Sequence, residues 1–391
     1  MREPEEPSAT ARILHIAQTT AGGIASYFEE IAGYQAERYG RDNVAFLIPS
    51  GAEHRPKIDP AMIRTFGSAS RGPAALLSFA RSSLGAIQQF KPDIIHLHSS
   101  FAGAIIRAML AFRRKRPRVI YCPHGWAFSM EISDRRKRAY AAIERCLSRG
   151  TDLIHNVSHS EQQLAIDFGL PAAKTRVLVN GIARTPTPRR KARSGPLRFL
   201  FIGRHDRQKG LDILLDTIEH LPLRDMHFDI VGSGIVSGGV VDRPKAQNVT
   251  FYGWLAREST LQLLDHADAL IMPSRWDAAP IVALEAMREG VPIIGSNRGA
   301  IPEIVVDGVG GRIFDLDDRD SLSQLLQELD RAGLDRLGRT ARKRFETRYT
   351  ADRMNVAICD AYDAIRKDRH GLSRPSAGRL AVSNPSAELS T

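Results

Sequence analysis

The sequence predicts an α/β protein made of two domains, each built on a parallel sheet. Short apolar runs typical of buried strands alternate with longer segments whose apolar residues recur at helical spacing, and this alternation favours parallel sheets with helices on both faces. The length of 391 residues is enough for two full hydrophobic cores. Residues 186–196, rich in Pro and Arg, separate two such series and have the composition of a linker.

The linker defines an N-terminal domain of residues 11–185 and a C-terminal domain of residues 197–366. Residues 1–10 are polar and acidic, and residues 367–391 are rich in Ser, Pro and Ala. Such compositions bury too little apolar surface to fold, so we expect both terminal segments to be disordered.

Cysteine usage and hydropathy narrow the class of protein. Cys122, Cys146 and Cys359 are scattered without metal-site spacing, which fits a reducing cytosol better than a disulfide framework. No apolar run reaches the length of a transmembrane helix, and the first ten residues do not have the pattern of a signal peptide. We therefore expect a cytoplasmic protein.

The formal net charge of +11 points to an anionic partner. Basic runs occur at 113–116, 135–138 and 189–191, and two of the three lie in the N-terminal domain. No nucleic-acid-binding motif accompanies them, so we expect no nucleic acid partner. Peripheral attachment to anionic lipid at the inner face of the membrane is the hypothesis. Solvated surfaces and a basic linker are the alternative for each run.

In the N-terminal domain, strands are expected at 13–17, 43–48, 93–97, 119–122 and 153–157, with helices at 24–38, 74–90 and from about Glu161. Gly22 and Gly23 lie between the first strand and the first helix, where Rossmann-like units bring phosphate or substrate close to the backbone. The G-x-G-x-x-G spacing is not present, so a dinucleotide cofactor is not indicated.

Histidines follow two of these strands. His124 lies at the carboxyl end of the strand at 119–122, the edge at which open α/β sheets bind ligands. It is a candidate site residue, and a packed loop histidine is the alternative. His96 and His98 are expected to be structural, although His98 is also a candidate to line a cleft.

In the C-terminal domain, strands are expected at 197–202, 227–231, 249–252, 267–272 and 291–295, with helices from Leu211 and at 339–349 and 351–365. Gly203, Arg204 and Lys209 follow the first of these strands. Glycine lets the backbone approach a ligand, and the two cations on either arm of the loop suit a diphosphate.

The stretch 272–289 is the most informative part of the sequence. It passes from a buried strand through a turn into a helix, and Pro280 suits the first helical position. Asp277 precedes the helix and Glu285 lies inside it, with seven residues between them. The helix N-terminus attracts anions while two carboxylates hold hydroxyls, which matches a nucleotide sugar. An ordinary strand–loop–helix unit with solvated acids is the alternative.

The combination G-R-x-x-x-x-K-G at 203–210, D-x7-E at 277–285 and G-A-I-P-E-I-V at 299–305 resembles the retaining GT-B glycosyltransferases of family GT4, the glycosyl transferases group 1, of the exopolysaccharide and lipopolysaccharide type. The resemblance implies a GT-B fold, with two Rossmann-like domains facing a central cleft and the last helix packing back on the N-terminal domain. The family pattern is E-x7-E, so Asp277 and Ala278 depart from it.

The resemblance also implies residue roles. Arg204 and Lys209 stabilise the leaving diphosphate, Asp277 orients the transferred sugar, Glu285 holds the ribose and Gly253 lies near the base. The expected catalytic set is Arg204, Lys209, Asp277 and His124. The expected donor-binding set is Gly22, Gly23, Gly203, Gly253, Ala278, Ala279, Pro280, Ile281 and Glu285. No metal or other cofactor is expected.

The implied activity is retaining transfer of a sugar from a UDP- or GDP-linked donor to a hydroxyl of a glycan or lipid-linked acceptor, in surface polysaccharide biosynthesis. Because of the departures at Asp277 and Ala278, a catalytically weakened nucleotide-sugar-binding protein is an alternative. A GT-B epimerase or sugar-phosphate synthase is another.

Overall fold

The computed structural model describes residues 11–51, 55–70, 72–111, 113, 115–186, 193–220, 225–234 and 248–367. The predicted disordered segment 1–10, most of the predicted linker and nearly all of the C-terminal segment lie outside the described residues. The basic run at 189–191 also lies outside them.

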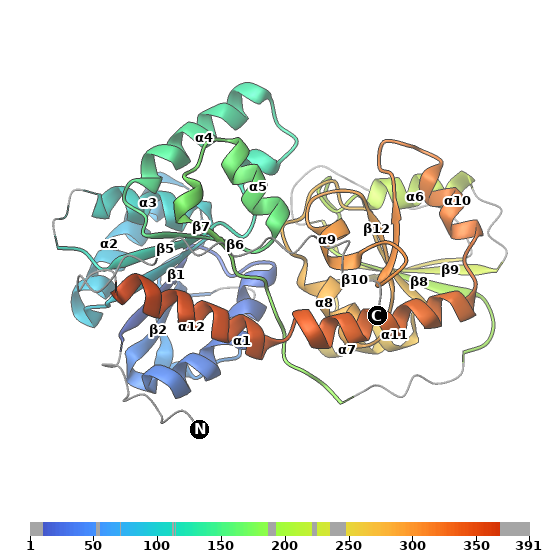
Figure 1. Cartoon of the computed structure of the whole chain (residues 1–391), viewed down its shortest axis with the longest axis horizontal. Coiled ribbons are helices and arrows are strands. Elements are labelled where there is room, and N and C mark those ends of the chain that lie inside the picture. The colour runs from blue at the N-terminus through green and yellow to red at the C-terminus, as the bar shows by residue number, and fades with distance from the viewer. Residues whose placement is uncertain are drawn as a thin grey trace.

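The N-terminal domain contains a seven-stranded parallel sheet in the order β3-β2-β1-β4-β5-β6-β7 (Figure 1). Its strands are β1 Ile13–Ala17, β2 Val44–Pro49, β3 Ile63–Phe66, β4 Ile94–His98, β5 Arg118–Cys122, β6 Leu153–Asn156 and β7 Thr175–Val177. Its helices are α1 Gly23–Tyr39, α2 Pro73–Phe90, α3 Ser100–Leu110, α4 Asp134–Ser148 and α5 His159–Asp167, with short 3-10 helices η1 Arg41–Asn43, η2 Pro60–Met62, η3 Ala127–Ser129 and η4 Ala172–Lys174.

The C-terminal domain contains a six-stranded parallel sheet in the order β10-β9-β8-β11-β12-β13. Its strands are β8 Leu197–Ile202, β9 Met226–Val231, β10 Val249–Gly253, β11 Ala269–Met272, β12 Ile293–Ser296 and β13 Gly311–Phe314. Its helices are α6 Leu211–His220, α7 Arg257–His266, α8 Ile281–Arg288, α9 Ile301–Val305, α10 Ser321–Gln327 and α11 Arg331–Arg348.

Each sheet is buried on both faces, which explains why its strands read as continuous apolar runs. In the N-terminal domain one core lies between the sheet and α1, and the other lies under α2 and α3. The C-terminal domain has one core that includes α8 and α11 and another that includes α6 and α10. The fold class predicted from the sequence is therefore confirmed.

The last helix, α12 Ala351–Lys367, leaves the C-terminal domain and lies along α1 in the N-terminal domain (Figure 1). Its crossing point is held by Ile182, whose N–H donates to Tyr349 O at 3.0 Å and whose carbonyl accepts from Ala351 N at 2.8 Å. A Cβ at the neighbouring Gly181 would lie 2.3 Å from Thr350 O, so only glycine fits there. The chain thus crosses between the domains twice at one place.

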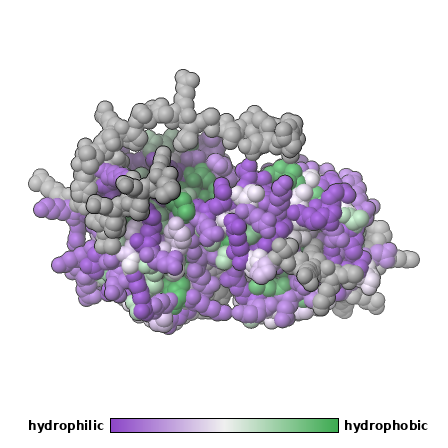
Figure 2. Space-filling model, turned by 60° about the horizontal axis from the view of Figure 1, so that its bottom comes forward, coloured by the Kyte–Doolittle hydropathy of each residue, from purple (hydrophilic) through white to green (hydrophobic). Residues whose placement is uncertain are grey.

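Expected and observed boundaries agree within a few residues for the predicted strands. The helix expected at 339–349 begins earlier, at Arg331, because Asp330 accepts a hydrogen bond from Gly333 N and caps it there. Helix α4 carries four successive basic residues that interrupt its apolar pattern, and it was not predicted. The face of the molecule drawn in Figure 2 is mostly hydrophilic with small separate apolar patches. Within the described residues, no helix is long and apolar enough to cross a bilayer.

Candidate active site

Loops of the two domains meet around the N-terminus of α8. A Cβ added to Gly23, at the start of α1, would lie 3.2 Å from Ile281 Cγ1, and one added to Gly125 would lie 3.8 Å from Ala278 Cβ. The Gly-rich loop and the His124 loop of the N-terminal domain therefore face the turn that precedes α8. The structure brings together candidate residues that the sequence places in separate halves of the chain.

Lys209 and Asp277 form an ion pair across 68 residues of sequence, between Nζ and Oδ2. The two side chains are only 18% and 11% exposed, so solvent screens the pair weakly. The loops that carry them are also joined through Gln208, whose carbonyl accepts from Arg275 N at 2.8 Å and whose Nε2 donates to Trp276 O at 3.1 Å. These hydrogen bonds between the two loops hold Lys209 and Asp277 close together.

Arg204 is held within its own loop. Its Nε donates to Asp206 Oδ2 at 2.7 Å and its Nη2 donates to Gln208 Oε1 at 2.9 Å. From the sequence, Arg204 and Lys209 are expected to face one diphosphate. That each of these cations has a carboxylate partner within the protein was not expected. Asp206 lies inside the same eight-residue loop, but nothing in the loop's charge pattern singled it out.

The turn at Asp277 is supported by the loop at 299–303. Gly299 has a φ of +57°, and a Cβ at this position would lie 2.3 Å from Asp277 O and 2.8 Å from Asp277 N. The next residue, Ala300, donates its N–H to Asp277 O at 2.9 Å. Gly299 therefore permits a backbone contact that fixes where the Asp277 carboxylate lies.

We expect Gly299→Ala to destabilise the protein by more than the cost of a left-handed alanine and to displace Asp277. The left-handed conformation alone costs about 1–2 kcal/mol for a residue with a Cβ, and the clash with Asp277 adds to it. Gly308→Ala is the matched control, because Gly308 has a φ of +74° but its Cβ would meet nothing within 4 Å. Urea denaturation of both variants measures the difference, and equal free energies of unfolding would contradict the prediction.

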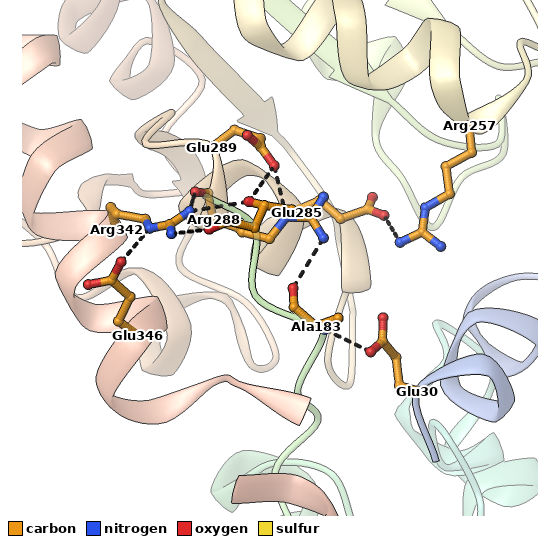
Figure 3. Close-up of polar contacts among 9 residues, drawn as sticks. Glu30, Ala183, Arg257, Glu285, Arg288, Glu289, Arg342 and Glu346 are labelled. Atoms are coloured by element: carbon orange, nitrogen blue, oxygen red, sulfur yellow. Dashed lines mark hydrogen bonds and ion pairs between the residues drawn. The ribbon is translucent and has the colours of Figure 1, made fainter. Parts of the chain in front are cut away.

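Glu285 lies in α8 with its side chain 13% exposed, and it pairs with Arg257 Nη2 at 2.8 Å (Figure 3). Burial raises the pKa of Glu285, while Arg257 and Arg288 act in the opposite direction. Arg257 also lies 3.3 Å from Glu29 on α1, so it connects the carboxylate to the other domain. Pro280 is the N-cap and the helix begins at Ile281, which corrects the expectation that Pro280 is its first residue.

The remaining predicted glycines differ in their surroundings. Gly22 and Gly253 have φ values of +71° and +68°, and a Cβ at either would meet no atom within 4 Å. At Gly203 a Cβ would lie 3.2 Å from Lys209 Cγ, so this glycine leaves room for the lysine stem. Ala279 lies in the same turn before α8 as Asp277 and Ala278.

His124 is partly exposed and has a φ of +53°. Its loop is held by Glu161, whose carboxylate accepts from Gly125 N at 2.8 Å and from Val157 N at 2.7 Å. Burial raises the pKa of Glu161 to about 7. In the sequence, Glu161 marks only the approximate start of a helix, and nothing there connects it to the His124 loop.

Glu303 also joins the two domains. Its Oε2 accepts from His159 N at 2.9 Å and from Ser160 N at 3.3 Å, at the start of α5. A carboxylate at a helix N-terminus is stabilised by free N–H groups and the helix dipole. Glu303 comes from the C-terminal domain, so it caps a helix of the other domain, and no local sequence signal reveals this.

A cluster of histidines lies beneath His124. Within the described residues, His15, His96 and His98 form the group whose potential metal-ligand atoms lie closest, within 4.8 Å of one another, and all three are buried. His98 Nδ1 lies 2.9 Å from His124 Nε2. His98 is therefore buried behind the partly exposed His124. That the protein works without a metal stays a prediction.

We expect the free energy of unfolding to fall as the pH is lowered from about 6.5 to about 4. Burial lowers the pKa of His15 and His155 to about 4 and of His124 to about 3, and holds those of His96 and His98 well below 6.5. In this window the unfolded chain binds protons that the folded chain does not, so each histidine contributes up to about 1.4 kcal/mol per pH unit.

Buried carboxylates act in the opposite direction, because burial raises the pKa of Glu161 to about 7 and also raises those of Glu30 and Glu285, so the folded state retains protons there. The five histidines outnumber these three carboxylates, so the histidines determine the sign. Urea denaturation between pH 7.5 and 4.5 measures the slope. His155→Phe should flatten it, whereas a change at the exposed His220 should leave it unchanged. A pH-independent stability of the wild type would contradict this expectation.

Comparison with known families covers most of the chain. Residues 22–181 match the glycosyl transferase 4-like domain, and residues 196–331 match the glycosyl transferases group 1. Each match covers most of one parallel-sheet domain, and together they include every predicted site residue.

Three related proteins show the range of this similarity. A 41.2 kDa protein in the cps region of Klebsiella pneumoniae is 31% identical over 326 residues, or 80% of this chain and 88% of that protein. A glycogen synthase of Mycobacterium tuberculosis is 30% identical over 73% of this chain and 72% of its own. The amylovoran biosynthesis glycosyltransferase AmsK of Erwinia amylovora is 26% identical over 63% of each chain.

Among solved structures, HepE of Anabaena, in complex with UDP and glucose, superposes with a TM-score of 0.71. The superposition covers 90% of this chain and 100% of HepE at 18% sequence identity, so it bears on the fold. Both domains, the interdomain site and the sequence matches lead to one conclusion. The chain belongs to the group 1 glycosyltransferases with a GT4-like N-terminal domain, and it has the GT-B fold.

Proposed function

We propose that the protein is a retaining glycosyltransferase that moves a sugar from a nucleoside diphosphate to a hydroxyl of a glycan or lipid-linked acceptor. The observation that carries this proposal is the cluster of Lys209, Arg204 and Asp277 at the N-terminus of α8, with Glu285 further along the same helix. Two cations and a helix N-terminus suit a diphosphate, while the two carboxylates suit hydroxyls of a sugar and a ribose.

The internal ion pairs suggest how the donor is received. Lys209 exchanges the Asp277 carboxylate for oxygens of the diphosphate, and Asp277 is then free to accept a hydrogen bond from the sugar. Arg204 likewise exchanges the Asp206 carboxylate for oxygens of the diphosphate. Before donor binding, each cation is compensated, which avoids an isolated charge at a site that is largely buried.

In the reaction, the bond between the anomeric carbon and the diphosphate oxygen breaks, and a bond from the acceptor oxygen to that carbon forms. Lys209, Arg204 and the α8 N-terminus stabilise the charge that develops on the leaving diphosphate. The proton of the acceptor hydroxyl passes to a phosphate oxygen of the leaving group. We assign no protein nucleophile and no metal to this step.

The relatives support the substrate class. HepE was solved with UDP and glucose, and AmsK is an amylovoran biosynthesis glycosyltransferase. By similarity, we propose a UDP- or GDP-linked donor and a role in surface polysaccharide biosynthesis. A weakened binding protein would bind the nucleotide without transfer, and an epimerase or synthase would convert the donor without a glycan acceptor.

Helix α4 supports attachment to an anionic membrane. Arg135, Arg136 and Arg138 are exposed along it, and Tyr140 and Ile143 are 39% and 51% exposed on the same helix. Cations beside apolar side chains suit the interface of an anionic bilayer. We propose that this helix holds the enzyme at the cytoplasmic face, near a lipid-linked acceptor.

Accordingly, we expect the protein to sediment with vesicles that contain phosphatidylserine and not with neutral phosphatidylcholine vesicles. Arg135→Glu/Arg136→Glu should abolish sedimentation, because each basic residue contributes about 1 kcal/mol at such a surface. Arg339→Glu/Lys343→Glu on α11 makes the same charge change at exposed positions of the other domain and should have little effect. Equal binding to both vesicles would exclude this attachment.

The donor site is tested by a thermal-shift series with UDP, GDP, ADP and CMP on the wild type and on Arg204→Ala/Lys209→Ala. A ligand that binds only the folded state raises the midpoint by mass action. Stabilisation of the wild type by one nucleotide, and not of the variant, would support the site and identify the base. If no nucleotide stabilises the wild type, the donor proposal is wrong.

A further inference from the structure

Two runs of hydrogen bonds lie buried in the N-terminal domain, and one of them ends at His124. The first includes His155 on β6 and His96 on β4, and the second includes His15 on β1 and His98 on β4, all of which are fully buried. A neutral imidazole has one N–H donor and one acceptor nitrogen, so each partner in such a run fixes the tautomer of the next. The direction of the first run can therefore be worked out from a group whose role is unambiguous.

That group is the backbone carbonyl of Leu178, which can only accept. His155 Nε2 lies 2.8 Å from it and must carry the proton, which leaves His155 Nδ1 as an acceptor. His96 Nε2 lies 3.4 Å from His155 Nδ1 and is the donor there. His96 Nδ1 is then an acceptor, so the Tyr362 hydroxyl, at 2.7 Å, donates its single proton to it.

Gln35 on α1 sets the direction of the second run. Its Oε1 is an amide oxygen, which can only accept, and it lies 2.8 Å from His15 Nε2, so His15 Nε2 is the donor. Within the described residues, Gln35 Nε2 has no hydrogen-bond partner.

The rest follows step by step. His15 Nδ1 is an acceptor, so His98 Nε2, at 3.0 Å, is a donor. His98 Nδ1 is then an acceptor, so His124 Nε2, at 2.9 Å, is also a donor. His124 is left with an unprotonated Nδ1. Within the described residues this nitrogen has no hydrogen-bond partner, and the His124 side chain is partly exposed.

We propose that the run from Gln35 through His15 and His98 sets the tautomer of His124, so that His124 presents a hydrogen-bond acceptor to the donor sugar. Gln35, His15 and His98 are positioning residues in this scheme, since none of them touches substrate. Naming the ligand as a sugar rests on the proposed function, whereas the tautomer itself does not.

The unprotonated Nδ1 of His124 affects how the sugar donor is oriented. An unprotonated Nδ1 accepts from O–H or N–H groups and repels phosphate oxygens. Across the domain boundary, Gly125 faces Ala278, beside the Lys209 and Asp277 pair that suits the diphosphate. A neutral acceptor on one side and cations on the other would orient the donor, with the sugar hydroxyls toward His124 and the phosphates toward Lys209.

A metal ion held by His15, His96 and His98 is the competing use of the same nitrogens. Three neutral ligands in a fully buried site would leave a divalent charge uncompensated, and two of the nitrogens, His15 Nδ1 and His98 Nε2, already form one hydrogen bond. The hydrogen bonds use these two nitrogens without an added charge.

The experiment is nitrogen-15 NMR of the full-length protein labelled in histidine, at pH 7. Long-range proton–nitrogen correlations distinguish protonated from unprotonated ring nitrogens. We expect His15, His96, His98, His124 and His155 all to be neutral and protonated at Nε2. An Nδ1–H tautomer or a charged ring at any of the five would overturn the proposal. One equivalent of Zn²⁺ should leave these signals unchanged, and a shift of the His15, His96 and His98 signals would establish the metal site instead.

Gln35→Met removes the acceptor oxygen at the start of this relay, so we expect His124 to become a mixture of tautomers and kcat/KM for transfer to fall about tenfold, the net effect of one hydrogen bond. Gln35→Glu is the rescuing variant, because a carboxyl oxygen also accepts from His15. Ser83→Ala, at another fully buried polar position, is the control.

The outcomes separate the two proposals. If the wild-type tautomers are as expected and no nucleotide stabilises the protein, the relay stands and the proposed function fails. If nucleotide binding is normal but Gln35→Met leaves the His124 signals unchanged, the relay fails and the proposed function stands. Should Gln35→Met not fold, the wild-type spectrum alone decides.

Discussion

Lys209→Ala is expected to lower the rate of sugar transfer by about 100- to 1,000-fold, the usual effect of removing one preorganised group that stabilises charge on a leaving or attacking oxygen. Lys209 forms an ion pair with Asp277 in the turn before α8, so it reaches the α8 N-terminus. Steady-state kinetics with the nucleotide sugar selected by the thermal-shift series would measure this loss.

The same change leaves Asp277, 11% exposed, without its partner, so part of the effect is on stability. Circular dichroism melting of the variant distinguishes lost folding from lost catalysis. Arg207→Ala is the matched control, because Arg207 lies in the same loop but is 68% exposed and pairs with Glu131 away from Asp277. If Lys209→Ala folds and turns over like Arg207→Ala, Lys209 is not the diphosphate cation.

Glu285→Ala is expected to weaken nucleotide binding by about 10- to 100-fold, since a hydrogen bond to a charged group contributes about 1.5–3 kcal/mol. The carboxylate is buried and paired with Arg257, so it is held in place before the ribose arrives. Isothermal titration with the nucleoside diphosphate measures the change. Loss of affinity with little change in kcat would agree with a role in holding the nucleoside.

The variant has a second expected consequence. Without Glu285, Arg257 keeps only Glu29 of the N-terminal domain, at 3.3 Å. Glu258→Ala is the appropriate control, because Glu258 is the next residue on α7 and pairs with Lys57 at an exposed position, where ion pairs contribute little. Equal nucleotide affinities of the Glu285→Ala and Glu258→Ala variants would remove Glu285 from the donor site.

Much of the fold and the central part of the site were predictable from local sequence. Strands such as β8 and β11 are continuous apolar runs because both faces of their sheets are covered. Lys209, Asp277 and Glu285 were identified because strand-to-helix loops at the carboxyl edge of a parallel sheet carry their chemistry in a few consecutive residues. Helix α4 was missed because its basic run hides its periodicity.

The contacts that decide how these residues behave join distant parts of the chain. Arg257 holds Glu285 and reaches Glu29, which is 228 residues away, and Tyr362 on the last helix hydrogen-bonds His96, which is 266 residues away. No spacing in the sequence encodes such pairs, because they depend on how the two domains and α12 pack together.

Two parallel α/β domains, the loops that carry the site and the family could be predicted, since these follow from hydropathy and from residues adjacent along the chain. Which carboxylate neutralises which cation is fixed only in the folded chain. The place of His124 at the end of a buried run of hydrogen bonds is also fixed only there. Burial and the distances between side chains determine charge and tautomer. Such burial and such distances arise only when strands far apart in sequence become neighbours in a sheet.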